Sequence, residues 1–423
     1  MRSRAFRRRL ATAVGVYGST ALGFLASIVA AVELSKADFA RFAIAFGTTS
    51  LLQLFVDLTV DEVVIKYGNR YAAREDWPRF HRLFRVGFLV KLAGGGLGTV
   101  AVIGAALLSP YIWRTGGVEG AMLIASLIPL IQQPEGMAGA VLTLRNRYDV
   151  RGAFLAWAMG LRLAAIWIGA RHGLLPVFIG IVAAQAVSTC SIGVVALAAF
   201  RRYPRAAPAP LGDDRAAIRA FAIQSTIASG LTSLRTSLPT VLVGVVAKAP
   251  QVANFRAAQA PQTGFQSLSA PARLVLLAEQ TRDVEHGRSD RAFALLHRYI
   301  GGTVALACVA GPPIWVFMPS LIRFAHLAKY TDATPAFRVM LLVASIQLVF
   351  GWTKTFPVSI GRVGMRTAGQ LLEVAVLIPA VLVLGALYGA TGAACGMLAG
   401  SAVLAAFWTV GLTRLPRPEA SPA

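Results

Sequence analysis

The chain has 423 residues, of which 41 are Lys or Arg and 19 are Asp or Glu, so its formal net charge is +22. Hydrophobic residues make up 56% of the chain and charged residues only 14%, and the mean hydropathy is +0.63. Soluble globular proteins are about 25% charged. This composition excludes an ordinary soluble enzyme, and the long apolar runs between the cations exclude a basic nucleic-acid-binding protein. It is typical of an all-α polytopic membrane protein.

Twelve apolar segments are long enough to cross a bilayer, because a spanning helix needs about 20 mostly apolar residues. In chain order the predicted spans are residues 10–34, 41–65, 86–108, 120–142, 152–171, 175–200, 220–246, 251–277, 293–319, 336–357, 367–387 and 389–413. The connections between them are short, and none is large enough to form a soluble domain.

Positive charge is distributed unevenly over the connections between these spans. The two termini and alternate connections together carry 26 Lys and Arg residues, the opposite connections carry 8, and the remaining 7 lie within or beside spans. Because loops rich in Lys and Arg stay on the cytoplasmic side, the bias predicts that both termini are cytoplasmic.

The two halves of the chain share a weak internal repeat. In the first half, a basic segment that ends at Arg151 is followed 22 residues later by Gly173, which opens a short connection between spans. In the second half, a basic segment that ends at Arg366 is followed 23 residues later by Gly389. We therefore predict two six-helix lobes around a central cavity, as in alternating-access transporters. The predicted lobes comprise residues 1–205 and 206–423.

Two arginines lie deep within spans, where a charge is costly unless it faces a cavity or a partner. Arg162 is near the middle of the fifth span and Arg235 near the middle of the seventh. Guanidinium groups form forked hydrogen bonds to phosphate, which favours a role in binding an anionic substrate. Pairing with a buried acid is the alternative. Lys91 and Lys354 lie nearer a cytoplasmic end, where snorkelling to the lipid headgroups explains them equally well.

The eighth span carries a polar stripe, with members three to four residues apart. The stripe consists of Arg256, Gln259, Thr263, Gln266, Ser269 and Arg273. A polar stripe on an apolar helix must meet water or polar partners. We interpret it as a groove for a glycan and its headgroup, with packing between helices as the alternative.

Acidic residues within spans are candidates for coupling transport to an ion. Asp57 and Asp61 are four residues apart in the second span and therefore share a helix face, and Glu135 follows Pro134 in the fourth. A buried carboxylate takes up a proton more readily than an exposed one. These groups would couple transport to H⁺ or Na⁺, or would serve as counter-ions for the buried cations.

No residues have the spacing of a catalytic, cofactor-binding or metal-binding motif. The five His residues show no HExxH pattern, and Cys190, Cys308 and Cys395 lie singly in apolar runs. Phosphate-binding loops and G-x-S-x-G turns are also missing from the sequence. We predict a protein that is not an enzyme and that has no cofactor, no metal and no nucleic-acid partner.

Three segments carry a family resemblance through their order and spacing. They are ELSKADFARFAIAF (33–46), LFVDLTVDEVVIKYG (54–68) and VANFRAAQAP (252–261). They resemble the "LGPEDFGLFA", "ADLGL…RY" and "VGXYRAA" elements of bacterial polysaccharide flippases, which belong to the multidrug/oligosaccharidyl-lipid/polysaccharide exporter superfamily. The sequence departs from those elements at Ala37, Ala40 and Thr59.

The resemblance implies a two-lobed transporter of twelve to fourteen helices in the bacterial inner membrane. Such a flippase moves undecaprenyl-pyrophosphate-linked oligosaccharide from the inner to the outer leaflet. The oligosaccharide is used to synthesise lipopolysaccharide, other surface polysaccharide or exopolysaccharide. Membrane lipids and polysaccharide-assembly proteins are the implied partners. Our candidate substrate ligands are Arg162, Arg235, Arg256, Gln259, Gln266 and Arg273. Our candidate ion-coupling residues are Asp57, Asp61 and Glu135.

Two other functions stay open at this stage. A cation-coupled multidrug exporter of the same superfamily would share the architecture, although a cavity with several arginines suits an anionic substrate better. A polytopic glycosyltransferase or polysaccharide polymerase would need a sizeable extracytoplasmic loop. The longest outward connection, 320–335, is short and holds Asp332 as its single acid.

Overall fold

The computed structural model is helical and contains no strand in the residues that it describes. Those residues are 2–56, 59–264, 288–360 and 363–413, together with Gln280 and Asp283. Seven of the described helices are long and apolar enough to cross a membrane. The protein is therefore an all-α, multi-pass membrane protein, as predicted. The finer prediction of twelve helices in two six-helix lobes around a central cavity stays a prediction.

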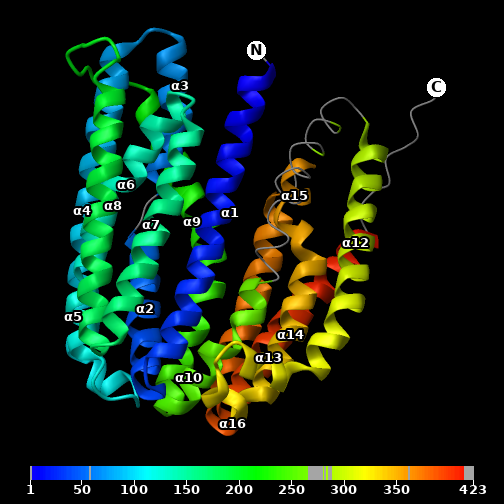
Figure 1. The fold of residues 1–423 in the computed structure, drawn as a ribbon. Helices are drawn as coiled ribbons and strands as arrows, with labels where there is room; N and C mark the ends of the chain where they lie inside the picture. Colours follow the sequence, from blue (N-terminus) through cyan, green and yellow to red (C-terminus); the bar gives the residue numbers. More distant parts are fainter. Residues whose placement is uncertain are drawn as a thin grey trace. The chain divides into compact units, whose positions relative to one another are not determined.

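The chain forms two compact units, residues 1–241 and 242–423. In the first unit, α1 packs along α7, α7 packs along α8, and α6 contacts both α4 and α8 (Figure 1). The helices of this unit are α1 (Arg2–Glu33), α2 (Lys36–Val56), α3 (Val60–Ala73), α4 (Trp77–Ile112), α5 (Glu119–Ala125), α6 (Leu127–Leu144), α7 (Tyr148–Ala170), α8 (Leu174–Phe200) and most of α9 (Asp214–Val246).

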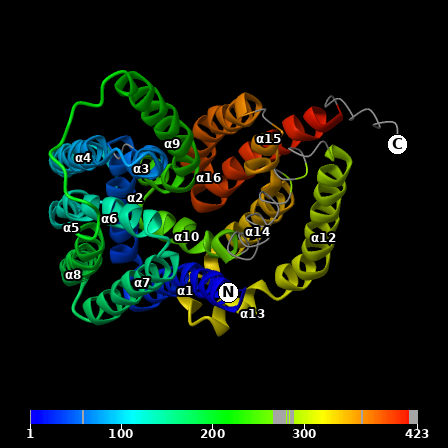
Figure 2. The same ribbon diagram turned by 90° about the horizontal axis from the view of Figure 1, so that it is seen from above.

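In the second unit, α14 contacts α10, α12 and α16, and Figure 2 shows α14 between α12 and α16 when the helices are viewed from above. A buried apolar cluster joins α12 and α16 to the segment 350–359, and it consists of Leu296, Trp352, Phe356, Leu404 and Trp408. The elements are α10 (Ala249–Ala258), α12 (Ser289–Val316), α13 (Met318–Phe324), the 3-10 helix η1 (Ala328–Ala333), α14 (Thr334–Val349), the 3-10 helix η2 (Phe350–Lys354), α15 (Phe356–Ser359) and α16 (Val363–Thr413).

Two predicted spans of the first unit are interrupted. The predicted span 41–65 is divided, because α2 ends at Val56 and α3 begins at Val60. The predicted span 120–142 is divided between α5 and α6 at Ser126. Pro129 has no N–H to donate to the carbonyl four residues earlier, and Thr99 of α4 donates its hydroxyl to the Ser126 carbonyl at 2.7 Å. Hydropathy does not register either effect.

The start of α9 forms a hydrogen bond and an ion pair with α3. Tyr71 donates its hydroxyl to the Asp214 carboxylate at 3.0 Å, and Arg70 forms an ion pair with the same carboxylate at 3.2 Å. Burial and the hydrogen bond to Asp214 raise the pKa of Tyr71 to about 12. These contacts place the start of α9 in the first compact unit. The predicted lobe boundary near residue 205 concerns membrane topology and stays a prediction.

The two glycine connections that define the internal repeat are sharp turns in the structure. Gly173 has φ +113° between α7 and α8, and Gly389 has φ +59° at a break within α16. A left-handed backbone of this kind favours glycine. At Gly389 the next amide, of Ala390, donates to the Gln251 side-chain oxygen at 2.9 Å. The structure confirms both predicted turns, and the break in α16 separates the predicted spans 367–387 and 389–413.

Candidate functional site

A polar cavity of about 200 Å³ lies within the first unit, and we call it the polar cavity. It contains the carboxylates of two acidic residues and the cations of two basic ones, although most of the surrounding helices are apolar. Ionisable groups in membrane-spanning helices are costly and generally face a partner or a water-filled space. The lining residues are Gln53, Asp61, Lys91, Gln132, Gln133, Glu135, Gly136, Gly139, Arg151, Leu155 and Ile192.

An ion pair joins α3 to α4 at one wall of the polar cavity. The ammonium of Lys91 lies 3.2 Å from the carboxylate of Asp61, with the two side chains 4% and 27% exposed. Asp61 is in the first turn of α3, where the helix dipole favours a negative charge. The snorkelling interpretation of Lys91 is therefore wrong, because its ammonium is buried against Asp61 inside the unit.

Glycines on α4 explain how Lys91 comes to be buried. Gly87 and Gly95 lie one turn before and one turn after it, on the same buried face of the helix. A Cβ atom at Gly95 would lie 2.9 Å from the Cα of Leu130, so α6 approaches the α4 backbone directly. Gly136 of α6 faces the ion pair itself, where an added Cβ would lie 3.5 Å from the Lys91 nitrogen. Small residues of this kind allow close helix packing in membranes.

A hydrogen-bonded network joins α6, α7 and α8 beside the same cavity. The Gln185 amide donates to the Glu135 carboxylate at 2.7 Å and contacts the Thr189 hydroxyl at 3.2 Å. Arg162 donates to the side-chain oxygen of Gln185 at 3.4 Å, and its guanidinium lies 5.4 Å from the centre of the Phe46 ring. Gln185 thus connects the acid to the arginine. The charge of Arg162 is compensated partly by Glu135 without a direct ion pair between them.

The remaining polar groups connect further helices to this site. Gln53 of α2 donates its amide to Gln132 of α6 at 3.2 Å. Arg151 at the start of α7 donates to the Thr143 hydroxyl at 2.9 Å. With Asp61, Glu135, Lys91, Arg151 and Arg162 all ionised, the site carries one excess positive charge. Protonation of either carboxylate would raise this excess, which would make the site more attractive to an anion.

The predicted site residues are only partly brought together. Arg162, Asp61 and Glu135 belong to the polar cavity and its hydrogen-bonded network. Arg256 and Gln259 lie in the second unit, where the Arg256 guanidinium donates to the Gln259 side-chain oxygen at 2.7 Å. Asp57, Gln266 and Arg273 lie outside the described residues, and so does the side chain of Arg235, whose backbone belongs to α9.

Several neutral members of the site have only a weak signal in the sequence. Gln185 is the connecting residue, and its signal was a single amide in the apolar run of the sixth span with Thr189 one turn later. Gln53, Gln132 and Gln133 line the cavity and were also not predicted. Arg151 ends a basic segment between two predicted spans, a position that indicates a loop charge and not a site residue. Pairs such as Lys91 with Asp61 depend on which helices are neighbours, which the sequence does not show.

Comparison with known proteins identifies related families and folds. A family described as polysaccharide biosynthesis protein matches residues 7–277. The chain is similar to an inward-facing multidrug resistance MATE family transporter of the MOP superfamily, with TM-score 0.76, 13% identity, and coverage of 93% of this chain and 94% of that chain. It is also similar to the lipid II flippase MurJ in its inward closed conformation, with TM-score 0.72, 12% identity, and coverage of 96% and 88%.

A third similar structure is a MOP superfamily transporter from Pyrococcus furiosus, with TM-score 0.63, 12% identity, and coverage of 97% of this chain and 94% of that chain. At these identities the likeness shows the fold. No curated protein sequence matches the chain significantly. The fold is therefore that of MATE and MurJ transporters, and these relatives are transporters and flippases.

Proposed function

The chain belongs to the polysaccharide biosynthesis protein family, and from this premise we propose that it is a flippase for undecaprenyl-pyrophosphate-linked oligosaccharide. It would move this lipid from the inner to the outer leaflet of the bacterial cytoplasmic membrane, with both termini on the cytoplasmic side. The product would supply surface polysaccharide or exopolysaccharide synthesis. The observation that carries the proposal is the charged polar cavity inside a membrane-spanning unit, because a pyrophosphate crossing hydrocarbon needs compensating cations.

In this proposal Arg162 binds the pyrophosphate, and the protonation state of Glu135 regulates that binding. While Glu135 is ionised, its carboxylate accepts the Gln185 amide and offsets the charge of Arg162. Protonation of Glu135 removes that negative charge and leaves Arg162 free to bind an anion. Uptake of a proton and capture of the substrate would then favour each other, which is the thermodynamic requirement for coupling. Asp61 would act in the same way through Lys91.

Further ligands would come from residues that the sequence pattern singles out. Arg235, Arg256, Gln259, Gln266 and Arg273 are proposed to bind the diphosphate and the adjoining sugars during alternating access. Asp57 is proposed to join Asp61 and Glu135 in coupling transport to H⁺ or Na⁺. No catalytic step is assigned to any of these residues, and membrane lipids and polysaccharide-assembly proteins are the proposed partners.

Deleting the gene in its native host is expected to abolish the surface glycan and to leave full-length lipid-linked precursor in the inner leaflet. The reason is that assembly of the precursor precedes translocation and does not need the flippase. Glycan staining of whole cells and extraction of lipid-linked precursor measure both effects. Plasmid-borne wild-type protein is expected to restore the glycan.

Two outcomes of the same experiment would contradict the proposal. Increased sensitivity to cationic drugs with normal glycan would show a multidrug exporter. Precursor that reaches the outer leaflet but is not elongated would show a polymerase. Both phenotypes are readable in the strain that carries the deletion, without any variant of the protein.

A further inference from the structure

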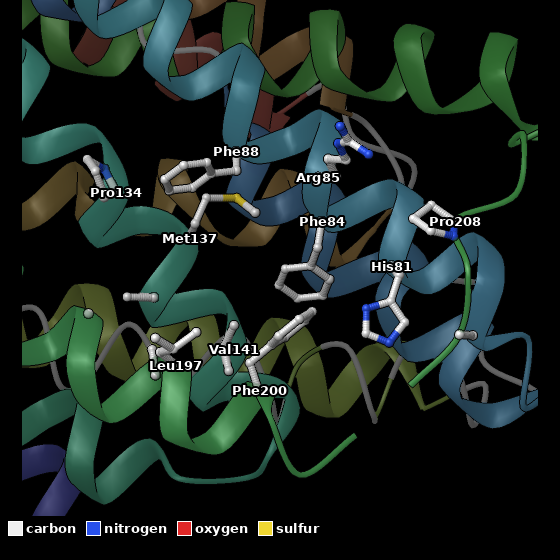
Figure 3. Close-up of a pocket in the computed structure, with 14 residues that line it drawn as sticks. His81, Phe84, Arg85, Phe88, Pro134, Met137, Val141, Leu197, Phe200 and Pro208 are labelled. Carbon is white, nitrogen blue, oxygen red and sulfur yellow. The ribbon is translucent and has the colours of Figure 1, made fainter. Parts of the chain in front are cut away.

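A second cavity of about 460 Å³ lies in the first unit, and we call it the apolar pocket (Figure 3). It is formed by α4, α6, α8 and the segment 201–213 that joins α8 to α9. On α6 it is lined by Pro134, Met137, Ala138 and Val141, which share one helix face because they are three or four residues apart. The polar cavity uses the opposite face of α6. The two cavities are therefore separated by this helix.

The walls of the apolar pocket suit a hydrocarbon chain. Phe84, Val141, Leu197 and Phe200 gather around it in Figure 3. Phe88 and Leu197 are 41% and 49% exposed on the outer surface of the unit. The apolar pocket is thus continuous with the apolar surface that would face the membrane lipids. Its volume lies in the range of about 300–1,000 Å³ that is usual for small-molecule sites.

One end of the apolar pocket is basic. His81 and Arg85 lie there beside Pro208, and Pro134 and Leu197 lie toward the other end (Figure 3). Arg85 is exposed, and no acidic side chain of the described residues forms an ion pair with it. His81 donates from its Nε2 atom to the Pro204 carbonyl at 2.8 Å, which holds the segment 201–213 across this end.

The charge around this end matches a membrane surface. Arg82 of α4 is exposed, and so are Arg201, Arg202 and Arg205 of the segment that His81 holds against α4, on the side predicted to be cytoplasmic. Juxtamembrane basic residues of this kind attract anionic lipid headgroups. An apolar pocket with a cation at its interfacial end fits a lipid that has a buried chain and a phosphate at the surface.

We propose that the apolar pocket binds one acyl chain of an anionic glycerophospholipid, whose phosphate is held by Arg85. The carried lipid-linked sugar fits less well, because its polar head would need the polar cavity on the other side of α6. The bound phospholipid would fill the space between α4 and α8 behind α6. It would thereby support the helix that carries Glu135. The proposal does not depend on which substrate the protein transports.

The test uses the full-length protein, purified in detergent, stripped of lipid, and titrated with single lipids under native mass spectrometry. The probes are phosphatidylglycerol, phosphatidylcholine with the same acyl chains, and undecaprenyl phosphate.

Gly193→Phe fills the apolar pocket, because a Cβ at Gly193 meets no atom within 4 Å. Gly104→Phe on α4 is the matched control, since it also meets nothing within 4 Å and does not line the pocket. Arg85→Gln removes the charge, with Arg114→Gln as its control, because Arg114 is exposed beyond the other end of α4 and does not line the pocket.

The wild type is expected to bind phosphatidylglycerol more tightly than phosphatidylcholine. Arg85→Gln should weaken phosphatidylglycerol binding by about fivefold, the effect of one basic residue at a lipid surface. Gly193→Phe should abolish it, and both controls should bind as the wild type does.

Equal binding of the two phospholipids, or unchanged binding in Gly193→Phe, would overturn the proposal. A third result would also overturn it. If Gly193→Phe lost binding of undecaprenyl phosphate but kept binding of phosphatidylglycerol, the apolar pocket would be part of the substrate path. If Gly193→Phe does not fold, the comparison of Arg85→Gln with Arg114→Gln decides, since both side chains are exposed.

Discussion

Arg162→Ala is expected to reduce surface glycan on the order of 100-fold while the amount of protein in the membrane stays normal. A hydrogen bond to a charged group contributes about 1.5–3 kcal/mol, and a guanidinium fork makes two such bonds to a phosphate. Losing both therefore costs at least about 3 kcal/mol, which corresponds to somewhat more than about 100-fold in rate. Whole-cell glycan staining and immunoblots of membranes measure the two quantities. Arg171→Ala is the matched control, because it removes an exposed arginine from the end of the same helix.

The double variant Arg162→Ala/Glu135→Gln separates substrate binding from charge compensation. If Arg162 served only as the counter-ion of Glu135, the double variant would produce as much glycan as Glu135→Gln alone. If Arg162 binds the pyrophosphate, the double variant produces less glycan than Glu135→Gln alone although its thermal stability recovers. We expect the second result. Recovery of glycan in the double variant to the level of Glu135→Gln alone would remove Arg162 from the substrate site and leave it as a structural partner of the Glu135–Gln185 network.

Asp61→Asn is expected to lower the stability of the protein by about 3 kcal/mol, the lower end of the range for breaking a buried ion pair. The lower end applies because Asp61 is 27% exposed, whereas Lys91 is only 4% exposed and would lose a carboxylate 3.2 Å away. Thermal unfolding of the purified protein in detergent measures the change. Asp38→Asn is the matched control, since the Asp38–Arg41 pair is 30% and 36% exposed and is worth about 0–1 kcal/mol.

The neutral double variant Asp61→Asn/Lys91→Met provides a second readout. Removing both charges should recover most of the lost stability, because a buried pair can be replaced by apolar groups with little net cost. If the recovered protein still fails to produce surface glycan, Asp61 acts in transport as well as in folding. A double variant as unstable as Asp61→Asn alone would show that the ion pair is not what stabilises this junction of α3 and α4.

The positions of most spans could be predicted from sequence because apolar runs record burial in lipid directly. The interruption at Ser126 was not predicted, because it depends on Pro129 and on a hydrogen bond from Thr99, which lies on another helix. The glycine turns at Gly173 and Gly389 were predicted, since a positive φ restricts the residue type locally. Constraints that act on a single residue could thus be predicted from the sequence, and contacts between helices distant in sequence could not.

The same distinction holds for the polar cavity. Arg162, Asp61 and Glu135 were identified because a charge within an apolar run is conspicuous. Gln185 was not, because one neutral amide changes the hydropathy of a span very little. The burial of Lys91 depends on Gly95 and Gly136, which let α4 and α6 approach each other closely. Sequence therefore indicated three charged members of the site, whereas the roles of Lys91 and Arg151 depend on helix packing.

The most direct test of the proposed function is translocation by the purified protein in liposomes. Undecaprenyl-pyrophosphate-linked oligosaccharide would be incorporated with the protein, and a membrane-impermeant glycosidase would measure how much of it becomes accessible from outside. Wild-type protein should make accessible the substrate that begins in the inner leaflet, and Arg162→Ala should leave it protected. Protection that is identical with and without wild-type protein, while a cationic dye is transported in the same liposomes, would contradict the assignment as a flippase.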